Sequence, residues 1–195
     1  MYKAIDIVLL PPDDVMEQII QINQKLSNKL RLNHIDCLPH ISLAMGSIEV
    51  NDLGKFQMDL YRIACAHKQI RVKLNEFYYT GNSDTASLCL RVGVQDDLSI
   101  LHESLIKLLG SYSDRFISKD MFFGDDQIDD SSLQWVQNYK IYSSFQNFDP
   151  HITIGYGQIA LKECPLEFEV SKLAVCHLGN RCTCRQILLL LELQG

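Results

Sequence analysis

One octapeptide pattern occurs twice in this chain, as PHISLAMG at residues 39–46 and as PHITIGYG at residues 150–157. Both copies have the same proline, histidine, first isoleucine and last glycine, while serine becomes threonine and leucine becomes isoleucine. Successive side chains of a strand point to opposite faces. Each copy, read as a strand, therefore presents one imidazole beside one hydroxyl, and its two aliphatic residues form an apolar back.

The hydrophobic pattern around the two copies predicts a mixture of strands and helices. Residues 2–10 are apolar and β-rich up to a double proline, whereas apolar residues recur every three or four positions from 15 to 30. In chain order we expect a strand at 2–10, a helix at 13–32, a strand at 38–50 with a bend near Gly46, a helix at 51–67, paired strands at 70–80 and 86–94 around a turn at 81–84, a helix at 96–110, a strand at 150–156, and a closing hairpin of 168–178 with 184–193.

This layout indicates an internal repeat. Each half begins with a strand and a helix, continues into the His strand, and has a strand pair that turns at a Gly-Asn dipeptide, at 81–82 and at 179–180. We therefore interpret residues 1–195 as one two-lobed domain with a repeat of about 1–84 and 85–195. The second half is longer, which places an insertion within 111–149.

The repeated motif carries a specific chemistry if the two copies face each other across a cleft. His40 and His151 then supply two imidazoles, and Ser42 and Thr153 supply two hydroxyl donors, with no carboxylate at the centre. One neutral imidazole can accept a proton from a nucleophile and one imidazolium can donate a proton to a leaving oxygen. Hydroxyl donors can hold phosphate oxygens. This set can open or close a cyclic phosphodiester without a metal or another cofactor.

The motifs H-I-S-L and H-I-T-I resemble the paired H-x-[S/T]-x signature of the 2H phosphoesterase superfamily, which includes 2′-5′ RNA ligase-like proteins and cyclic nucleotide phosphodiesterases. The resemblance covers most of the chain. It implies an α+β fold with two lobes, in which antiparallel sheets flank a central cleft and helices lie outside. It also implies metal-independent action on 2′,3′-cyclic phosphates or 2′,5′-phosphodiester bonds. By position, His40 and His151 are the acid–base pair, and Ser42 and Thr153 bind the phosphate.

The segment 111–149, which contains the insertion, is rich in aromatic residues, since it holds nine of the chain's 17. They are Tyr112, Phe116, Phe122, Phe123, Trp135, Tyr139, Tyr142, Phe145 and Phe148. We expect most of these rings to cover the core of their own lobe. The alternative is that one or two of them stack on a base of the substrate.

The composition limits the classes of molecule that we expect this protein to bind. The chain has 195 residues and a net charge of −6, without the basic bias of proteins that grip long duplexes. We expect a cytoplasmic monomer that binds an RNA end or a small cyclic or 2′,5′-linked nucleotide, and neither a membrane nor a long duplex. Several cationic residues lie in predicted strands or hairpins, where they are candidates to meet a phosphate or ribose: Arg71, Lys73, Arg91, Arg181 and Arg185. For each one taken singly, a solvated surface cation is the favoured interpretation.

The seven cysteines predict reduced thiols, because their number is odd and nothing in the sequence indicates export. A zinc site is the alternative for the last hairpin, if its turn places His177 opposite Cys182 and Cys184 on the same face. The missing fourth ligand and the absence of a C-x-x-C pair argue against it, and we expect no metal.

Three functions remain open at this point. The first is a 2H-type cyclic phosphodiesterase, whose residues serve the reverse, ligating direction equally well. The second is a non-catalytic module that binds nucleotides or RNA ends on the same fold. The third is a structural partner protein with a decayed cleft. The natural substrate, the identity of the acid and the base, and the choice between hydrolysis and ligation are not decided by the sequence.

Overall fold

The computed structural model describes residues 1–26, 30–80, 86–113, 116–124, 127–157, 159 and 166–194. Its elements are β1 (Tyr2–Leu10), α1 (Asp13–Gln24), β2 (Ile41–Glu49), η1 (Val50–Asp52), α2 (Leu53–Ala66), β3 (Ile70–Thr80), β4 (Ser87–Val92), α3 (Asp96–Gly110), η2 (Lys119–Met121), α4 (Asp130–Tyr142), η3 (Phe145–Asn147), β5 (His151–Tyr156), β6 (Leu166–Val170), β7 (Lys172–Leu178), η4 (Asn180–Cys182) and β8 (Cys184–Glu192). The strands form two antiparallel four-stranded sheets with the orders β2-β1-β7-β8 and β5-β4-β3-β6.

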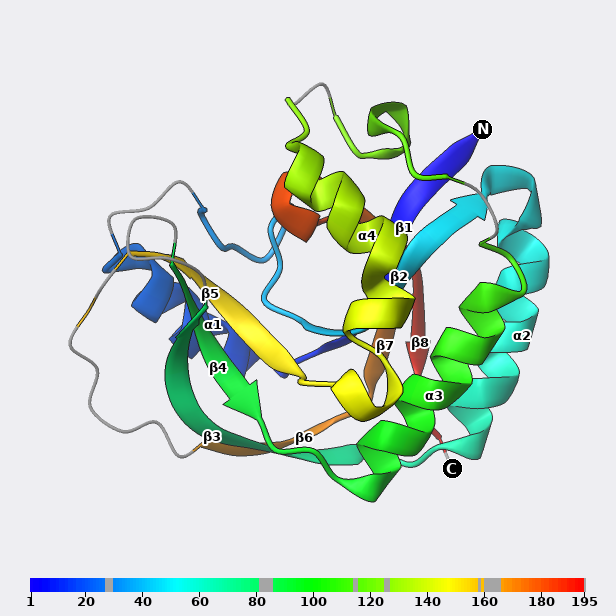
Figure 1. Ribbon diagram of the computed structural model, residues 1–195. Coiled ribbons are helices and arrows are strands. Elements are labelled where there is room, and N and C mark those ends of the chain that lie inside the picture. The colour runs from blue at the N-terminus through cyan, green and yellow to red at the C-terminus, as the bar shows by residue number, and fades with distance from the viewer. Residues whose placement is uncertain are drawn as a thin grey trace.

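The two sheets are the cores of two lobes, and the chain passes between them (Figure 1). The first sheet joins both ends of the chain, since β1 pairs with β2 on one side and with β7 on the other, and β7 pairs with β8. The second sheet is built from the middle of the chain. Helices α2 and α3 pack against β8 and β2 of the first sheet. Helix α1 follows β1 but packs against β5 of the second sheet. The expected α+β fold with antiparallel sheets and outer helices is confirmed.

The first sheet has two different faces. The face toward α2 and α3 is apolar and fully buried, and its side chains join those of both helices in one large core cluster: Ile5, Ile7, Leu9, Ile41 and Leu43. Burying side chains of this size contributes roughly 1.5–3 kcal/mol each. The opposite face carries a smaller cluster that includes Val8, Cys176 and Cys184, with Met16 of α1 against it. By strand alternation, Asp6 lies on this second face.

Each repeated motif contains a β-bulge at the same place. In β2 the register against β1 skips Leu43, between Ser42 and Ala44. In β5 the register against β4 skips Ile154, between Thr153 and Gly155. An extra residue bends a strand and increases its local twist. This correspondence supports the proposed internal repeat, whose boundaries stay a prediction.

A buried polar side chain from a helix holds the carbonyl of each bulge residue. Asn23 of α1 donates through Nδ2 to the carbonyl oxygen of Ile154, at 2.7 Å. His102 of α3 donates through Nδ1 to the carbonyl oxygen of Leu43, at 2.7 Å, and its Nε2 accepts the backbone N–H of Phe145. These two bonds position the motif strands, and each crosses from one predicted half of the chain to the other.

The last glycine of the motif, Gly46 in one copy and Gly157 in the other, is required for a different structural reason in each copy. A Cβ on Gly46 would lie 2.7 Å from Oγ of Ser113, whose hydroxyl accepts the backbone N–H of Ser47 at 2.8 Å. Gly157 has a φ of 113°, a conformation that side-chain-bearing residues rarely adopt. We expected a bend at Gly46. The strand instead pairs through Gly46 with Ile5, and its irregularity lies at the bulge.

Helix α1 ends earlier than the sequence pattern predicts, at Gln24 instead of near residue 32. The reason is the buried Asn23 side chain. Its Nδ2 also donates to the carbonyl oxygen of Leu30, and its Oδ1 accepts the N–H of Leu32, at 3.1 Å. These bonds turn the chain back on itself, so the prediction of a helix to residue 32 is wrong. Residues 27–29 lie outside the described part.

The strand expected at 168–178 is two strands, because the chain changes sheets near Ser171. Strand β6 pairs with β3 in the second sheet, whereas β7 lies between β1 and β8 in the first. The closing hairpin of β7 and β8 is confirmed, with η4 in its turn. The turn predicted at 81–84 lies outside the described residues. The predicted insertion contains α4, which packs against β2.

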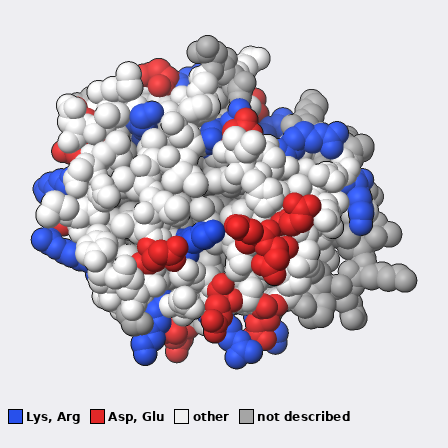
Figure 2. Space-filling model, turned by 180° about the vertical axis from the view of Figure 1, so that it is seen from behind, with Lys and Arg blue, Asp and Glu red and all other residues white. Residues whose placement is uncertain are grey.

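The surface agrees with the acidic composition. On the face turned away in Figure 1, the Lys and Arg side chains are scattered and Asp and Glu gather beside them (Figure 2). Among the described helices, none is long and apolar enough to span a bilayer.

Candidate active site

His40 and His151 are anchored in the same way at the start of the motif strands. Nδ1 of His40 donates to the carbonyl oxygen of Leu38 at 2.7 Å, and Nδ1 of His151 donates to that of Asp149 at 2.9 Å. In both cases the acceptor lies two residues earlier in the chain. A carbonyl oxygen can only accept, so each Nδ1 carries the hydrogen. In the neutral ring, Nε2 therefore holds the free lone pair.

The fold brings the two histidines near each other, although they belong to different sheets. Strands β2 and β5 approach where the motifs lie. Burial lowers the pKa of the His40 imidazole, and the charge of the nearby His151 lowers it further, while the bond to the Leu38 carbonyl opposes both. The His40 side chain is 15% exposed. A small part of this side chain therefore reaches solvent.

The two motif hydroxyls lie beside their histidines but have different partners. Ser42 Oγ donates to Oδ2 of Asp6 at 2.6 Å. Thr153 Oγ1 lies 3.8 Å from Sγ of Cys89 on the neighbouring strand. The second contact is a weak one, because a thiol is a poor hydrogen-bonding partner. The threonine hydroxyl is therefore more available to a ligand than the serine hydroxyl.

Asp6 corrects the expectation that no carboxylate lies at the centre. Its side chain is fully buried, and Oδ2 lies 3.8 Å from Nε2 of His40. Its other oxygen, Oδ1, has no hydrogen-bond partner among the described residues. Burial raises the pKa of Asp6 well above its ordinary value, against the opposing effect of the Ser42 hydrogen bond. The signal in the sequence was a single aspartate inside the apolar run of β1.

The surroundings of His151 are more exposed and contain several charges. The ring of Tyr78 meets His151 edge to face, at 6.1 Å between centroids. Arg91, opposite His151 in the register of β4 and β5, lies over the Tyr78 ring at 4.3 Å. It also pairs with Asp149 at 2.9 Å and with Glu76 at 3.1 Å. Arg91 is thus held by two carboxylates.

A polar cavity of about 510 Å³ has Cys37 in its wall. Cys37 precedes Leu38, whose carbonyl oxygen anchors His40. Three arginines line it: Arg31, Arg181 and Arg185. Arg181 pairs with Asp129 at 3.4 Å and Arg185 with Asp36 at 3.6 Å, and Nε of Arg185 is buried without a hydrogen bond among the described residues. Two of the cationic candidates from the sequence therefore meet here. Arg71 instead pairs with Glu167 on the second sheet.

Several aromatic side chains of the insertion pack against the protein itself. Phe148 stacks on His102 with the centroids 3.8 Å apart, and Tyr112 meets Phe56 edge to face. Tyr139 is buried, and its hydroxyl donates to the carbonyl oxygen of Ser42 at 3.5 Å. Four others are exposed: Phe116, Trp135, Tyr142 and Phe145. Base stacking by one of them stays a prediction.

The zinc arrangement considered for the last hairpin does not form. His177 pairs in register with Gln186, and its ring nitrogens contact Nζ of Lys3 and the carbonyl oxygen of Met121. Cys176 and Cys184 point to the opposite face, toward Asp6. The turn is longer than the sequence suggested, which shifts the pairing. The six described cysteines are free thiols, and Cys164 lies outside the described residues.

The chain is similar to solved structures over its whole length. TT0787 from Thermus thermophilus matches with a TM-score of 0.64 and 15% identity, covering 98% of each chain. E. coli LigT in complex with 3′-AMP matches with a TM-score of 0.56 and 14% identity, covering 100% of each. A protein described as a phosphoesterase matches with a TM-score of 0.57 and 14% identity, also over 100% of each. No family model matches the chain, and no curated protein matches it in sequence. The likeness shows a LigT-type fold, as expected from the resemblance to the 2H superfamily.

Proposed function

We propose that this chain is a metal-independent phosphoesterase of the 2H type. It cleaves 2′,3′-cyclic phosphates or 2′,5′-phosphodiester bonds in RNA ends or nucleotides, and its residues also allow the reverse ligation. The observation that carries this proposal is the matched anchoring of His40 and His151 through Nδ1, which leaves two Nε2 atoms of the same tautomer at one site. A satisfied core histidine uses both ring nitrogens, as His102 does.

In this proposal His40 is the general base and His151 the general acid for hydrolysis. His40 is the more buried of the two imidazoles and has the lowered pKa, so it is neutral at pH 7. Its Nε2 takes a proton from the attacking water as the water oxygen bonds to phosphorus. The bond from phosphorus to one ribose oxygen breaks, and His151 gives its Nε2 proton to that oxygen. Two such groups each contribute roughly 10²–10⁴-fold to the rate.

The hydroxyls hold the non-bridging phosphate oxygens. Thr153 needs only to leave a weak contact with the Cys89 thiol. Ser42 must exchange its bond to Asp6 for one to the phosphate. Donors placed where negative charge develops stabilise the transition state without a metal ion.

The arginine-lined cavity supports an RNA end as substrate. One guanidinium group can bind two phosphate oxygens at once through parallel hydrogen bonds. The cavity lined by Arg31, Arg181 and Arg185 has room for a nucleotide beside the reacting phosphate. LigT, with the same fold, has been crystallised with 3′-AMP. A substrate with a second nucleotide would reach both the histidines and the cavity.

Turnover of 2′,3′-cyclic nucleotides and of a 2′,5′-linked oligoadenylate, measured in excess chelator, tests this proposal. His40→Ala and His151→Ala should each lower turnover by about 10²–10⁴-fold. His67→Ala is the matched control, because His67 lies at the end of α2 and bonds the carbonyl of Ile63. It should keep the wild-type rate.

The non-catalytic alternative gives a different result. A module that only binds nucleotides or RNA ends would show no turnover but saturable binding, and the two alanine variants would alter affinity alone. Complete loss of wild-type activity in chelator would contradict the two-histidine chemistry.

A further inference from the structure

We propose that Asp6, His40 and Cys184 form a binding site for a zinc-like divalent cation, and that the bound cation switches off the proposed activity by occupying Nε2 of His40. The switch rests on the proposed function, whereas the metal site itself does not. The site differs from the hairpin arrangement considered above, since neither His177 nor Cys182 belongs to it.

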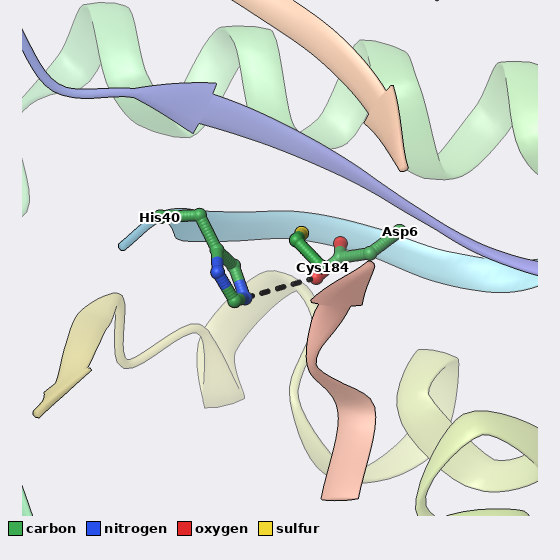
Figure 3. A group of neighbouring side chains, drawn as sticks. All are labelled: Asp6, His40 and Cys184. Carbon is green, nitrogen blue, oxygen red and sulfur yellow. Dashed lines mark ion pairs between the residues drawn. The ribbon is translucent and has the colours of Figure 1, made fainter. Parts of the chain in front are cut away.

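The three side chains converge from three strands of the first sheet (Figure 3). Asp6 lies in β1, His40 immediately precedes β2, and Cys184 begins β8. One ligand atom from each lies within 4.8 Å of the other two, and Nε2 of His40 is 3.8 Å from Oδ2 of Asp6. Ligand atoms around tetrahedral zinc lie about 3.3–3.8 Å apart. The widest pair therefore has to close by at most about 1.5 Å.

An unpartnered oxygen points to a missing ligand here. Oδ1 of Asp6 is fully buried and makes no hydrogen bond within the described residues. Such an atom destabilises the folded protein when nothing compensates it. A cation bound between Asp6 and Cys184 would satisfy it. Neither Ser42, which holds Oδ2, nor another described side chain does so.

His40 and Asp6 each have a hydrogen bond of the kind that orients the ligands of a metal site. The Leu38 carbonyl fixes the Nδ1–H tautomer of His40 and leaves Nε2 free to coordinate. The Ser42 hydroxyl holds Oδ2 of the carboxylate at 2.6 Å. Partners of this kind orient the ligands of metal sites and improve their affinity.

Charge balance favours a divalent cation in this buried place. A carboxylate, a thiolate and a neutral imidazole neutralise a 2+ ion, so the complex buries no net charge. Binding releases the proton of the Cys184 thiol and that of the Asp6 carboxyl where it is present. The sulfur and nitrogen ligands select a zinc-like ion over magnesium or calcium. Three protein ligands leave one tetrahedral position for water or a phosphate oxygen.

Cobalt(II) titration of the metal-free protein tests the site without any substrate. We expect one Co²⁺ per chain, with a thiolate-to-cobalt charge-transfer band in the near ultraviolet. Cys184→Ser should abolish that band and weaken binding at least about 100-fold. Cys176→Ser is the matched control, because Cys176 is a buried thiol beside Cys184 but outside the group of three. It should keep the band and the affinity.

Asp6→Asn provides a second test if Cys184→Ser does not fold. It removes an anionic ligand at nearly constant volume, so cobalt should bind at least about tenfold more weakly while the thiolate band persists at saturation. Absence of cobalt binding by the wild-type protein would overturn the site. So would a full-strength thiolate band in Cys184→Ser.

Zinc titration of turnover tests the switch. The wild-type rate should fall as Zn²⁺ reaches one equivalent and return when a chelator is added. Cys184→Ser should require at least about 100-fold more zinc, each protein being compared with its own metal-free rate. Equal zinc sensitivity of the wild type and Cys184→Ser would overturn the switch. If the wild type turns over none of the substrates, the proposed function fails, and the cobalt experiment still decides the site.

Discussion

The two halves of the candidate site hold their imidazoles alike and place them in different surroundings. His40 and His151 each bond a backbone carbonyl two residues earlier. His40, however, lies against the buried carboxyl of Asp6, whereas His151 lies against the ring of Tyr78 and near the pair of Arg91 and Asp149. The short motif thus fixes ring orientation and tautomer. The neighbouring strands set the electrostatics, and with them the proposed role of each histidine.

The pH dependence of the rate offers the sharpest test of this difference. Burial lowers the pKa of His40. The acidic limb of the pH profile, on which protonation inactivates the general base, should therefore lie below about pH 6.5. On that limb the rate should fall about tenfold per pH unit. The basic limb should report deprotonation of the general acid. The measurement is kcat/KM between about pH 4.5 and 9 in chelator. A flat profile would remove the acid–base roles of both residues.

The two helix side chains that hold the bulges should differ in stability effect. Asn23→Ala removes three hydrogen bonds of a buried side chain, to Ile154, Leu30 and Leu32, and should cost about 3 kcal/mol of unfolding free energy. His102→Ala removes two bonds and the stacking on Phe148, and should cost about 2–3 kcal/mol. Urea unfolding measures both. Losses below about 0.5 kcal/mol would show that the bulges are held by other contacts.

The motif hydroxyls separate catalysis from stability. Thr153→Ala should lower kcat/KM by about 10–100-fold with little change in unfolding, because its only described side-chain partner is a weak thiol contact. Ser42→Ala should lower kcat/KM similarly and also cost about 1–2 kcal/mol of stability, since it leaves Asp6 buried without its hydroxyl partner. Kinetics and urea unfolding on both variants give the comparison. Equal stability losses would contradict the difference between the two half-sites.

The smallest predicted effect concerns the pH dependence of stability through His102. Burial lowers the pKa of this imidazole in the folded protein. Below about pH 6.5 the unfolded chain binds a proton there that the folded protein does not, so stability falls as the pH falls. One such proton changes the free energy of unfolding by at most about 1.4 kcal/mol per pH unit. Between about pH 7.5 and 5, His102→Gln should lose less stability than the wild type. An identical loss would show that His102 does not contribute.

Much of the secondary structure was readable from the sequence, for local reasons. Strand β3 and helix α3 lie at the predicted residues, since alternation in one and recurrence every three or four positions in the other depend only on near neighbours. Helix α1 departs from its pattern because the side chain of Asn23 bonds residues beyond its end. These hydrogen bonds depend on the tertiary structure, and the periodicity of the sequence does not predict them.

The sequence by itself determined the two motifs, the residue types of the candidate site and most element boundaries. Only the tertiary structure decided that β7 lies between β1 and β8, that β6 pairs with β3, and that Asp6 faces His40 and Cys184. The physical reason is distance along the chain. Strand periodicity tells which side chains share a face, but β1 pairs with residues more than 160 positions later, and many such pairings satisfy the same pattern. The packing of both sheets selects one of them.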